Sequence, residues 1–159
     1  MAYRVTGLQR SAFAKYFGAS AEELAGMNAI RLIAQADRGY PCRVSLDDAC
    51  AGESVILLHH VSHDVANPYR SAYAIYIREQ ACDRAPFVNC LPPSFAGRTL
   101  SLRGFDADGM LQDALVAGPN GQEEAIRTLL KMPQVACIHA HHAAYGCYAA
   151  RIERDGEGL

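Results

Sequence analysis

The histidines of this 159-residue chain are the residues best placed by type and spacing to do chemistry. All six lie in two short segments, and they are His59, His60, His63, His139, His141 and His142. Side chains alternate between the two faces of a strand, so a strand here would place His139 and His141 on one face, roughly 6–7 Å apart at Cα. Two imidazoles at that spacing can bind one ligand or one metal ion. With His63 as a third ligand, they form a candidate site for divalent zinc, iron or manganese, and Asp106 or Cys147 could complete it instead.

Cys147 offers a second kind of chemistry, that of a thiol. It follows the His-x-His pair on the next expected strand and could face an imidazole across the hairpin. A cysteine beside a histidine deprotonates readily and can act as a nucleophile or a redox thiol. We expect the other five cysteines to be packing residues, because the sequence has no Cys-x-x-Cys pair of the kind that binds structural zinc.

Arginines could supply the recognition of an anionic substrate. Arg43 and Arg70 follow turn-forming sequences and Arg103 lies within an expected strand, so their guanidinium groups could converge on a carboxylate or phosphate. Tyr69 adds an aromatic ring with a polar tip beside Arg70, and Asp106 is a candidate acid or base. The alternative is that these arginines form salt bridges with nearby carboxylates.

The elements that must position these residues are mostly strands. Alternation and turn signals predict strands at 3–7, 28–36, 53–60, 69–77, 99–105, 110–116, 135–141 and 147–153. Helical spacing and capping residues predict helices at 9–17, 20–26 and 120–132, and one helical turn at 45–52. Many strands follow one another directly, which indicates the α+β class: a single domain with a largely antiparallel β-sheet and a few short helices. We expect this domain to span residues 1–153, with a frayed C-terminal tail at 154–159.

Composition excludes several classes of protein. Half of the residues are hydrophobic and 20% are charged, which is not the composition of a disordered chain. The formal net charge of −2 gives no positive field to attract nucleic acid or an anionic membrane, so we expect neither as a partner. The most apolar run, Val55–Leu58, is far shorter than the ~20 residues of a membrane span, and the basic N-terminal segment does not read as a signal peptide. We therefore expect a cytoplasmic protein.

Four blocks of the sequence resemble a bacterial family of unknown function, DUF1203. They are Pro-Cys-Arg-Val at 41–44, residues 68–71 with 74–79, residues 102–103 with 105–110, and residues 138–141 with 146–151. The resemblance implies a bacterial, single-domain, cytoplasmic protein, and it brings no activity, substrate or cofactor with it. An asparagine is common in that family at the place of His142, so His142 is not counted among the expected ligands.

These observations favour a small enzyme that acts on an anionic small molecule. Its pocket would contain His139, His141, Arg43, Asp106 and Cys147, with Tyr69, Arg70 and Arg103 as further ligand-binding residues and a divalent metal as a possible cofactor. The alternative is a non-catalytic ligand-binding or interaction module with a structural polar network. The sequence does not indicate an oligomeric state.

Overall fold

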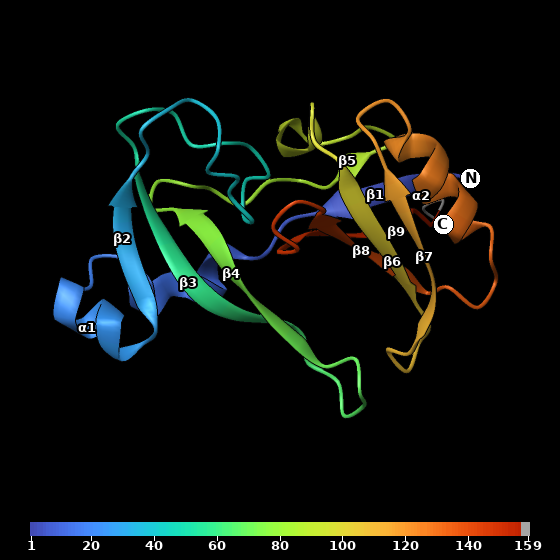
Figure 1. Cartoon of the computed structure of the whole chain (residues 1–159), viewed down its shortest axis with the longest axis horizontal. Helices are drawn as coiled ribbons and strands as arrows, with labels where there is room; N and C mark the ends of the chain where they lie inside the picture. The colour runs from blue at the N-terminus through green and yellow to red at the C-terminus, as the bar shows by residue number, and fades with distance from the viewer. Residues whose placement is uncertain (157–159) are drawn as a thin grey trace.

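Nine strands form two antiparallel sheets that lie side by side in the computed structural model, which describes residues 1–156 (Figure 1). The six-stranded sheet has the order β5 (Phe87–Val88), β1 (Tyr3–Thr6), β9 (Tyr148–Arg154), β8 (Cys137–His142), β6 (Leu100–Phe105), β7 (Leu111–Ala117). The three-stranded sheet has the order β2 (Ala29–Ile33), β3 (Ser54–His63), β4 (Ser71–Arg78). The predicted α+β class, with a largely antiparallel sheet and a few short helices, is confirmed.

The six-stranded sheet buries one face against helix α2 (Gln122–Leu130). Ile138 and Ala140 point to this face from β8, and they pack in one cluster with Ile126 and Leu129 of the helix. Alternation along β8 therefore directs His139 and His141 to the opposite face, toward the three-stranded sheet. The predicted hairpin of β8 and β9 is present, with Ala140 opposite Ala150.

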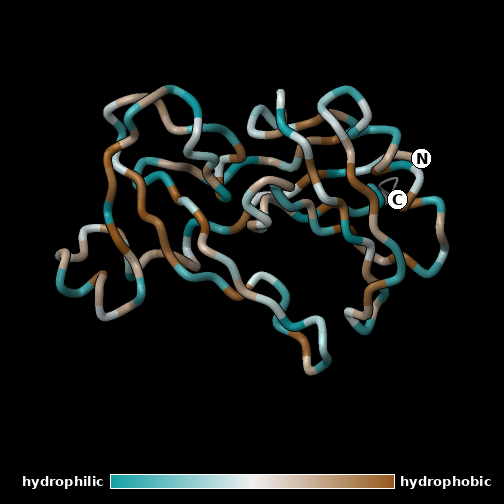
Figure 2. The backbone as a smooth tube through the Cα atoms, in the orientation of Figure 1, coloured by the Kyte–Doolittle hydropathy of each residue, from teal (hydrophilic) through white to brown (hydrophobic). Residues whose placement is uncertain are grey.

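The three-stranded sheet packs against the N-terminal segment. The 3-10 helix η1 (Arg10–Tyr16) and helix α1 (Ala21–Gly26) cover the face that carries Ile56, Leu58, Ile75 and Ile77. The predicted capping box that begins α1 is present, with Ser20 and Glu23 satisfying each other's backbone N–H groups. Apolar residues run along β2 and β3 in the backbone view (Figure 2).

Polar and aromatic side chains join the two sheets. Arg103 of β6 donates a hydrogen bond of 2.9 Å to the hydroxyl of Tyr73 on β4. His63 at the end of β3 contacts His139 of β8, with ring centroids 4.9 Å apart. The loop before β3 crosses between the sheets as well, where the backbone N–H of Arg43 donates to the carbonyl of Tyr76. The junction is thus formed by the segments in which the sequence concentrates its candidate functional residues.

The structure differs from the elements predicted by local sequence patterns at three places. Residues 45–52 contain no helical turn, because Ser45 bonds to Asp47 and Asp48 binds Arg98 instead of capping a helix. The segment 79–97, where the sequence predicts neither a strand nor a helix, contains β5 and the short 3-10 helix η2 (Pro93–Phe95). Arg154 closes β9 and donates to the carbonyls of Leu130, Met132 and Val135, so it is fixed in the fold rather than frayed. Residues 157–159 of the expected tail lie outside the described residues.

Within residues 1–156, none of the helices has the length and apolar character needed to cross a membrane.

Candidate functional site

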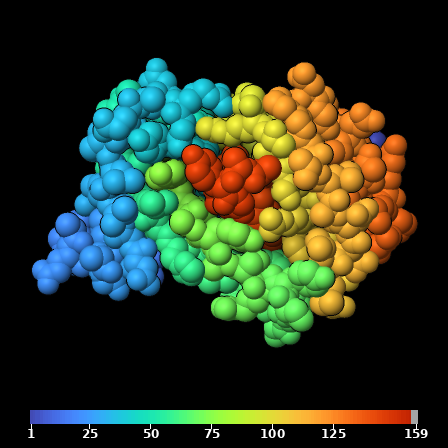
Figure 3. Space-filling view, in the orientation of Figure 1, coloured from blue at the N-terminus to red at the C-terminus, as the bar shows by residue number. Residues whose placement is uncertain are grey.

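A cavity of about 750 Å³ lies at the junction of the two sheets. Its wall comes from the loop before β3, from β3 and β4, from the loop after η2, and from the β8–β9 loop. The lining residues that could do chemistry are Arg43, Tyr73, Tyr76, Arg98, His142 and Cys147. In the space-filling view the β8–β9 loop occupies the centre of this face, between β4 and the loop that precedes β6 (Figure 3).

Arg43 is the most deeply buried charged residue of the cavity, with 1% of its surface exposed. Its guanidinium donates to the carbonyl oxygens of Tyr148, at 2.7 Å, and Pro41, and to Sγ of Cys147 at 3.0 Å. Burial lowers the pKa of Arg43, although the neighbouring sulfur of Cys147 acts in the opposite direction. No carboxylate is among its hydrogen-bond partners in the described chain, so the thiol of Cys147 is the one ionisable group that it binds directly.

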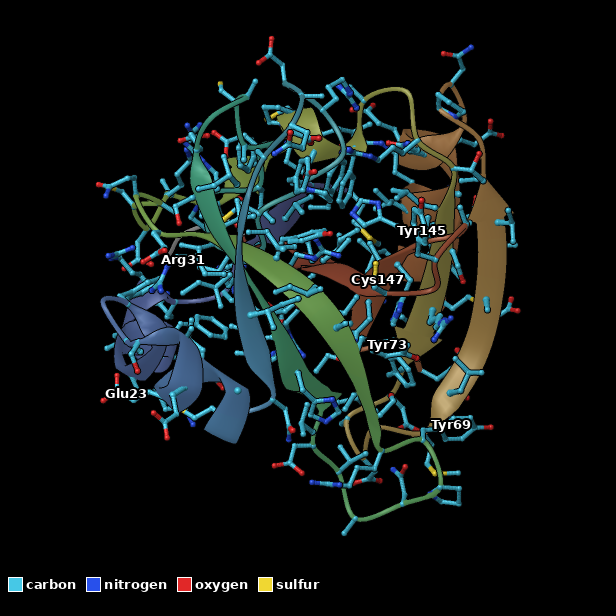
Figure 4. The ribbon with its side chains drawn as sticks, turned by 60° about the vertical axis from the view of Figure 1, so that its left-hand side comes forward. Glu23, Arg31, Tyr69, Tyr73, Tyr145 and Cys147 are labelled. Atoms are coloured by element: carbon cyan, nitrogen blue, oxygen red, sulfur yellow. The ribbon has the colours of Figure 1, made fainter. Side chains whose placement is uncertain are left out.

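The tight β8–β9 loop places Cys147 in this position. The N–H of Gly146 donates to the carbonyl of His142, and the N–H of His142 donates to the carbonyl of Cys147. Gly146 adopts a φ of +77°, a left-handed conformation that favours glycine, and its carbonyl accepts a hydrogen bond from Nδ1 of His141. Figure 4 shows Cys147 between β4 and the six-stranded sheet, with Tyr145 above it and Tyr73 below.

His142 is a buried histidine in the cavity wall. It is 6% exposed, and neither ring nitrogen has a hydrogen-bond partner in the described part of the protein. Burial lowers its pKa to about 3, with Arg43 and Arg98 acting in the same direction, so the ring is neutral near pH 7. A buried polar group without partners is costly and is usually satisfied by a ligand or water, so His142 marks a place where a bound molecule would make hydrogen bonds.

The charge of the cavity wall is positive. Arg43 and Arg98 both line it, whereas none of its lining residues is an aspartate or glutamate. Arg98 forms a two-pronged ion pair with Asp48, with oxygen–nitrogen distances of 2.7 and 2.6 Å. Arg43 has no such partner, so its charge remains available to the contents of the cavity.

The other predicted histidines lie nearby but point elsewhere. His139 and His63 form an edge-to-face pair beside Phe105, next to a second cavity of about 280 Å³ that Asp106 also lines. Burial lowers the pKa of His139 to about 3 and that of His141 to about 4. His63 donates through Nε2 to the carbonyl of Gly109. The two histidine segments therefore meet through the contact between the rings of His63 and His139, and Cys147 is not part of this contact.

The predicted metal site of His139, His141 and His63 has no matching cluster of ligands. Among residues 1–156, no group of three or more histidine, cysteine, aspartate or glutamate side chains is arranged to hold a metal ion. The ring of His141 packs edge to face on Tyr73 and Tyr148 instead of converging with His139.

Four further predicted site residues do not line the main cavity. Asp106 holds the β6–β7 turn by accepting from the N–H groups of Asp108 and Met110, and these bonds lower its pKa. Arg70 pairs with Asp64 at the surface. Tyr69 lies at the far end of the β3–β4 hairpin, away from Cys147 (Figure 4). Arg103 reaches the cavity only indirectly, through Tyr73.

Sequence reasoning missed His142, Arg98, Tyr76 and Tyr145 as cavity residues. The sequence could have indicated His142, because this residue lies five positions before Cys147 in a predicted hairpin. No sequence pattern indicated Arg98, since its position depends on the fold of the segment after η2. The expectation that five cysteines are packing residues is wrong, because Cys50, Cys82 and Cys90 are exposed and only Cys42 and Cys137 are buried.

Comparison with known proteins agrees with the resemblance seen in the sequence. A family model described as protein of unknown function, DUF1203, matches residues 39–154. The chain belongs to this family. The match begins at Gly39, so it includes every residue that lines the main cavity of this DUF1203 protein, but not η1, α1 or β2. No curated protein matches the chain, and no solved structure does.

Proposed function

We propose that this protein is an enzyme that uses Cys147 as a nucleophile toward a small anionic molecule bound in the main cavity. The observation that carries the proposal is the 3.0 Å contact between the Arg43 guanidinium and Sγ of Cys147, inside a cavity of about 750 Å³. A guanidinium that donates to sulfur favours the thiolate, which is the reactive form of cysteine.

Arg43 is a buried charge with few compensating partners. An unpaired charge removed from water is costly, and carbonyl oxygens supply only partial compensation. Arg43 is 1% exposed and has two carbonyls and one thiol as partners. An anionic substrate in the cavity would supply the negative charge that these partners lack.

The reaction that we propose is a nucleophilic substitution at a carbon atom of the bound molecule. The thiolate of Cys147 forms a bond to an electrophilic carbon, and the leaving group departs with the bonding electron pair. His142 is neutral near pH 7, so it offers the bound molecule one N–H donor and one lone pair. The positively charged wall stabilises the negative charge that moves from the sulfur to the leaving group.

One observation favours the alternative of a non-catalytic binding module. The bonds from Arg43 to the carbonyls of Pro41 and Tyr148 join two segments far apart in sequence, which is a structural role. In that case Cys147 would be only a third acceptor in a polar network. Either function is consistent with six free cysteines in a reducing compartment, and we place the protein in the bacterial cytoplasm with no nucleic acid or membrane as partner.

Alkylation by iodoacetamide at pH 7 tests the nucleophile. Mass spectrometry of the digested protein gives the rate at each cysteine, and the exposed Cys50, Cys82 and Cys90 serve as internal references. We expect Cys147 to react at least tenfold faster than these three, although it is less exposed. A rate at or below theirs would refute the nucleophile and favour the binding module.

Iodoacetate in place of iodoacetamide tests the preference for anions. The two reagents transfer groups of similar size and differ in charge. Because Arg43 lines the cavity without a carboxylate partner, we expect the ratio of the iodoacetate rate to the iodoacetamide rate to be several-fold higher at Cys147 than at Cys82. Equal ratios at the two cysteines would contradict an anionic substrate.

A further inference from the structure

We infer that the substrate is amphipathic, with an anionic, electrophilic head in the main cavity and an apolar tail on the outer face of the three-stranded sheet. This inference rests on the proposed function, and it names the class of molecule on which the thiol acts. The structural basis is an apolar groove that continues from the cavity across β3 to β2.

The groove has a volume of about 420 Å³ and a mainly apolar wall. Its residues come from the end of α1, from β2, β3 and β4, and they are Ala25, Asn28, Ala29, Ile30, Leu57, Leu58, His59 and Ala74. Leu57 and Ala74 line the main cavity as well. The two hollows are thus neighbours on one sheet face and share part of their floor.

Strand register explains why this face is apolar and open. Ile30 of β2 lies opposite Leu57 of β3, which lies opposite Tyr76 of β4, so these three side chains form one row across the sheet. The opposite face is covered by η1 and α1. Ile30 remains 51% exposed, which leaves an apolar side chain in solvent at the end of the groove that lies farther from the main cavity.

The charges of the two hollows match an anion with an apolar tail. The cavity wall contains Arg43, which has no carboxylate partner, whereas no aspartate, glutamate, lysine or arginine lines the groove. Crossing from β4 to β2 takes two strand spacings, about 10 Å, a distance that an alkyl chain of moderate length covers. Each methylene group that is buried on this floor adds to the free energy of binding. A substrate without an apolar tail would leave the groove exposed to water.

Alkylating reagents of different chain length test the inference. Iodoacetamide and N-octyl iodoacetamide carry the same reactive group, and the rate at Cys147 is divided by the rate at the exposed Cys82 for each reagent. We expect this normalised rate to be at least tenfold higher for the octyl reagent. Ile30→Gln should bring the ratio of the two normalised rates close to one, since it makes the far end of the groove polar.

Ile33→Gln provides the matched control. Ile33 lies on the same strand and is 50% exposed, but it does not line the groove. We expect this variant to keep the tenfold preference for the octyl reagent. An equal loss in both variants would show a general effect of polarity on β2 and would overturn the inference.

Two outcomes separate this inference from the function on which it rests. If Cys147 reacts no faster than the exposed cysteines with iodoacetamide, the proposed function fails. If Cys147 is fast but the octyl chain brings no gain, the inference alone fails. A dimer that dissociates in Ile30→Gln without any change in the rate ratio would show that a second copy of the chain covers the groove, and that result would also overturn the inference.

Discussion

Arg43 connects three parts of the molecule through a single side chain. It lies in the loop before β3, and its guanidinium reaches the backbone at Pro41, the backbone of β9 at Tyr148, and the sulfur of Cys147. Arginine suits this position because its planar group presents several donors in fixed directions, whereas lysine has one flexible ammonium. Under the proposed function, a change at Arg43 would therefore affect both the stability of the fold and the reactivity of Cys147.

Arg43→Met is expected to lower the free energy of unfolding by about 3 kcal/mol, because two buried carbonyl oxygens lose their donor. It should also reduce the alkylation rate of Cys147 to that of the exposed cysteines. Urea denaturation followed by circular dichroism measures the first effect. Arg70→Met is the control, because Arg70 pairs with Asp64 at the surface, and we expect a change below about 1 kcal/mol. Equal losses in both variants would argue against the role of Arg43.

At the scale of elements, the loop that carries Arg43 is held in place by the segment after β1. The N–H of Leu8 donates to the carbonyl of Arg43 at 2.7 Å. A Cβ atom at Gly7 would overlap the carbonyl oxygen of Val44 and lie 3.1 Å from that of Arg43. The absence of a side chain at Gly7 thus allows two backbone segments to approach each other beside the cavity.

We expect Gly7→Ala to displace the Arg43 loop. The free energy of unfolding should fall by about 1–3 kcal/mol, as for other overpacked positions, and the alkylation rate of Cys147 should fall with it. Gly26→Ala is the control, because a Cβ at Gly26 meets nothing within 4 Å. Cys147 should remain fully reactive in that variant, and a loss there would show that the assay reports general destabilisation.

At the scale of the whole molecule, the two sheets meet through buried neutral rings. His139 and His141 face the three-stranded sheet, and His142 lines the cavity between the sheets. Burial lowers the pKa of these three histidines from the ordinary 6.5 to about 3, 4 and 3. The unfolded chain therefore binds more protons than the folded chain once the pH falls below 6.5.

Stability should consequently decrease as the medium is acidified. The contribution of the three neutral histidines to the free energy of unfolding is fully present above pH 6.5. It is lost progressively as the pH falls toward the folded-state pKa values, by about 1.4 kcal/mol per histidine between pH 7.5 and 5.5. The three together give a loss on the order of 4 kcal/mol. Urea denaturation at pH 7.5, 6.5 and 5.5 measures it. His139→Gln should reduce the slope by about a third, and a stability that does not change over this range would contradict the burial of neutral rings.

Much of the fold follows from local sequence. Ser20 and Glu23 predict the start of α1, and the alternation through His139 and His141 predicts β8 and the hairpin with β9. Such features depend on residues within a few positions of one another, so short-range rules are sufficient to find them. The helical turn predicted at residues 45–52 is absent, because the partner of Asp48 is Arg98, fifty residues away.

The sequence by itself determined eight of the nine strands in the described residues, their antiparallel character, and the presence of histidine, cysteine and arginine in the segments that meet. Only the tertiary structure decided which of them act together. Arg43 and Cys147 are 104 residues apart, and their contact depends on how a loop and a hairpin pack between two sheets. Arg70 lies in an equally suggestive sequence, but the long β3–β4 hairpin carries it to the surface. Contacts between distant segments arise from packing, which no local pattern encodes.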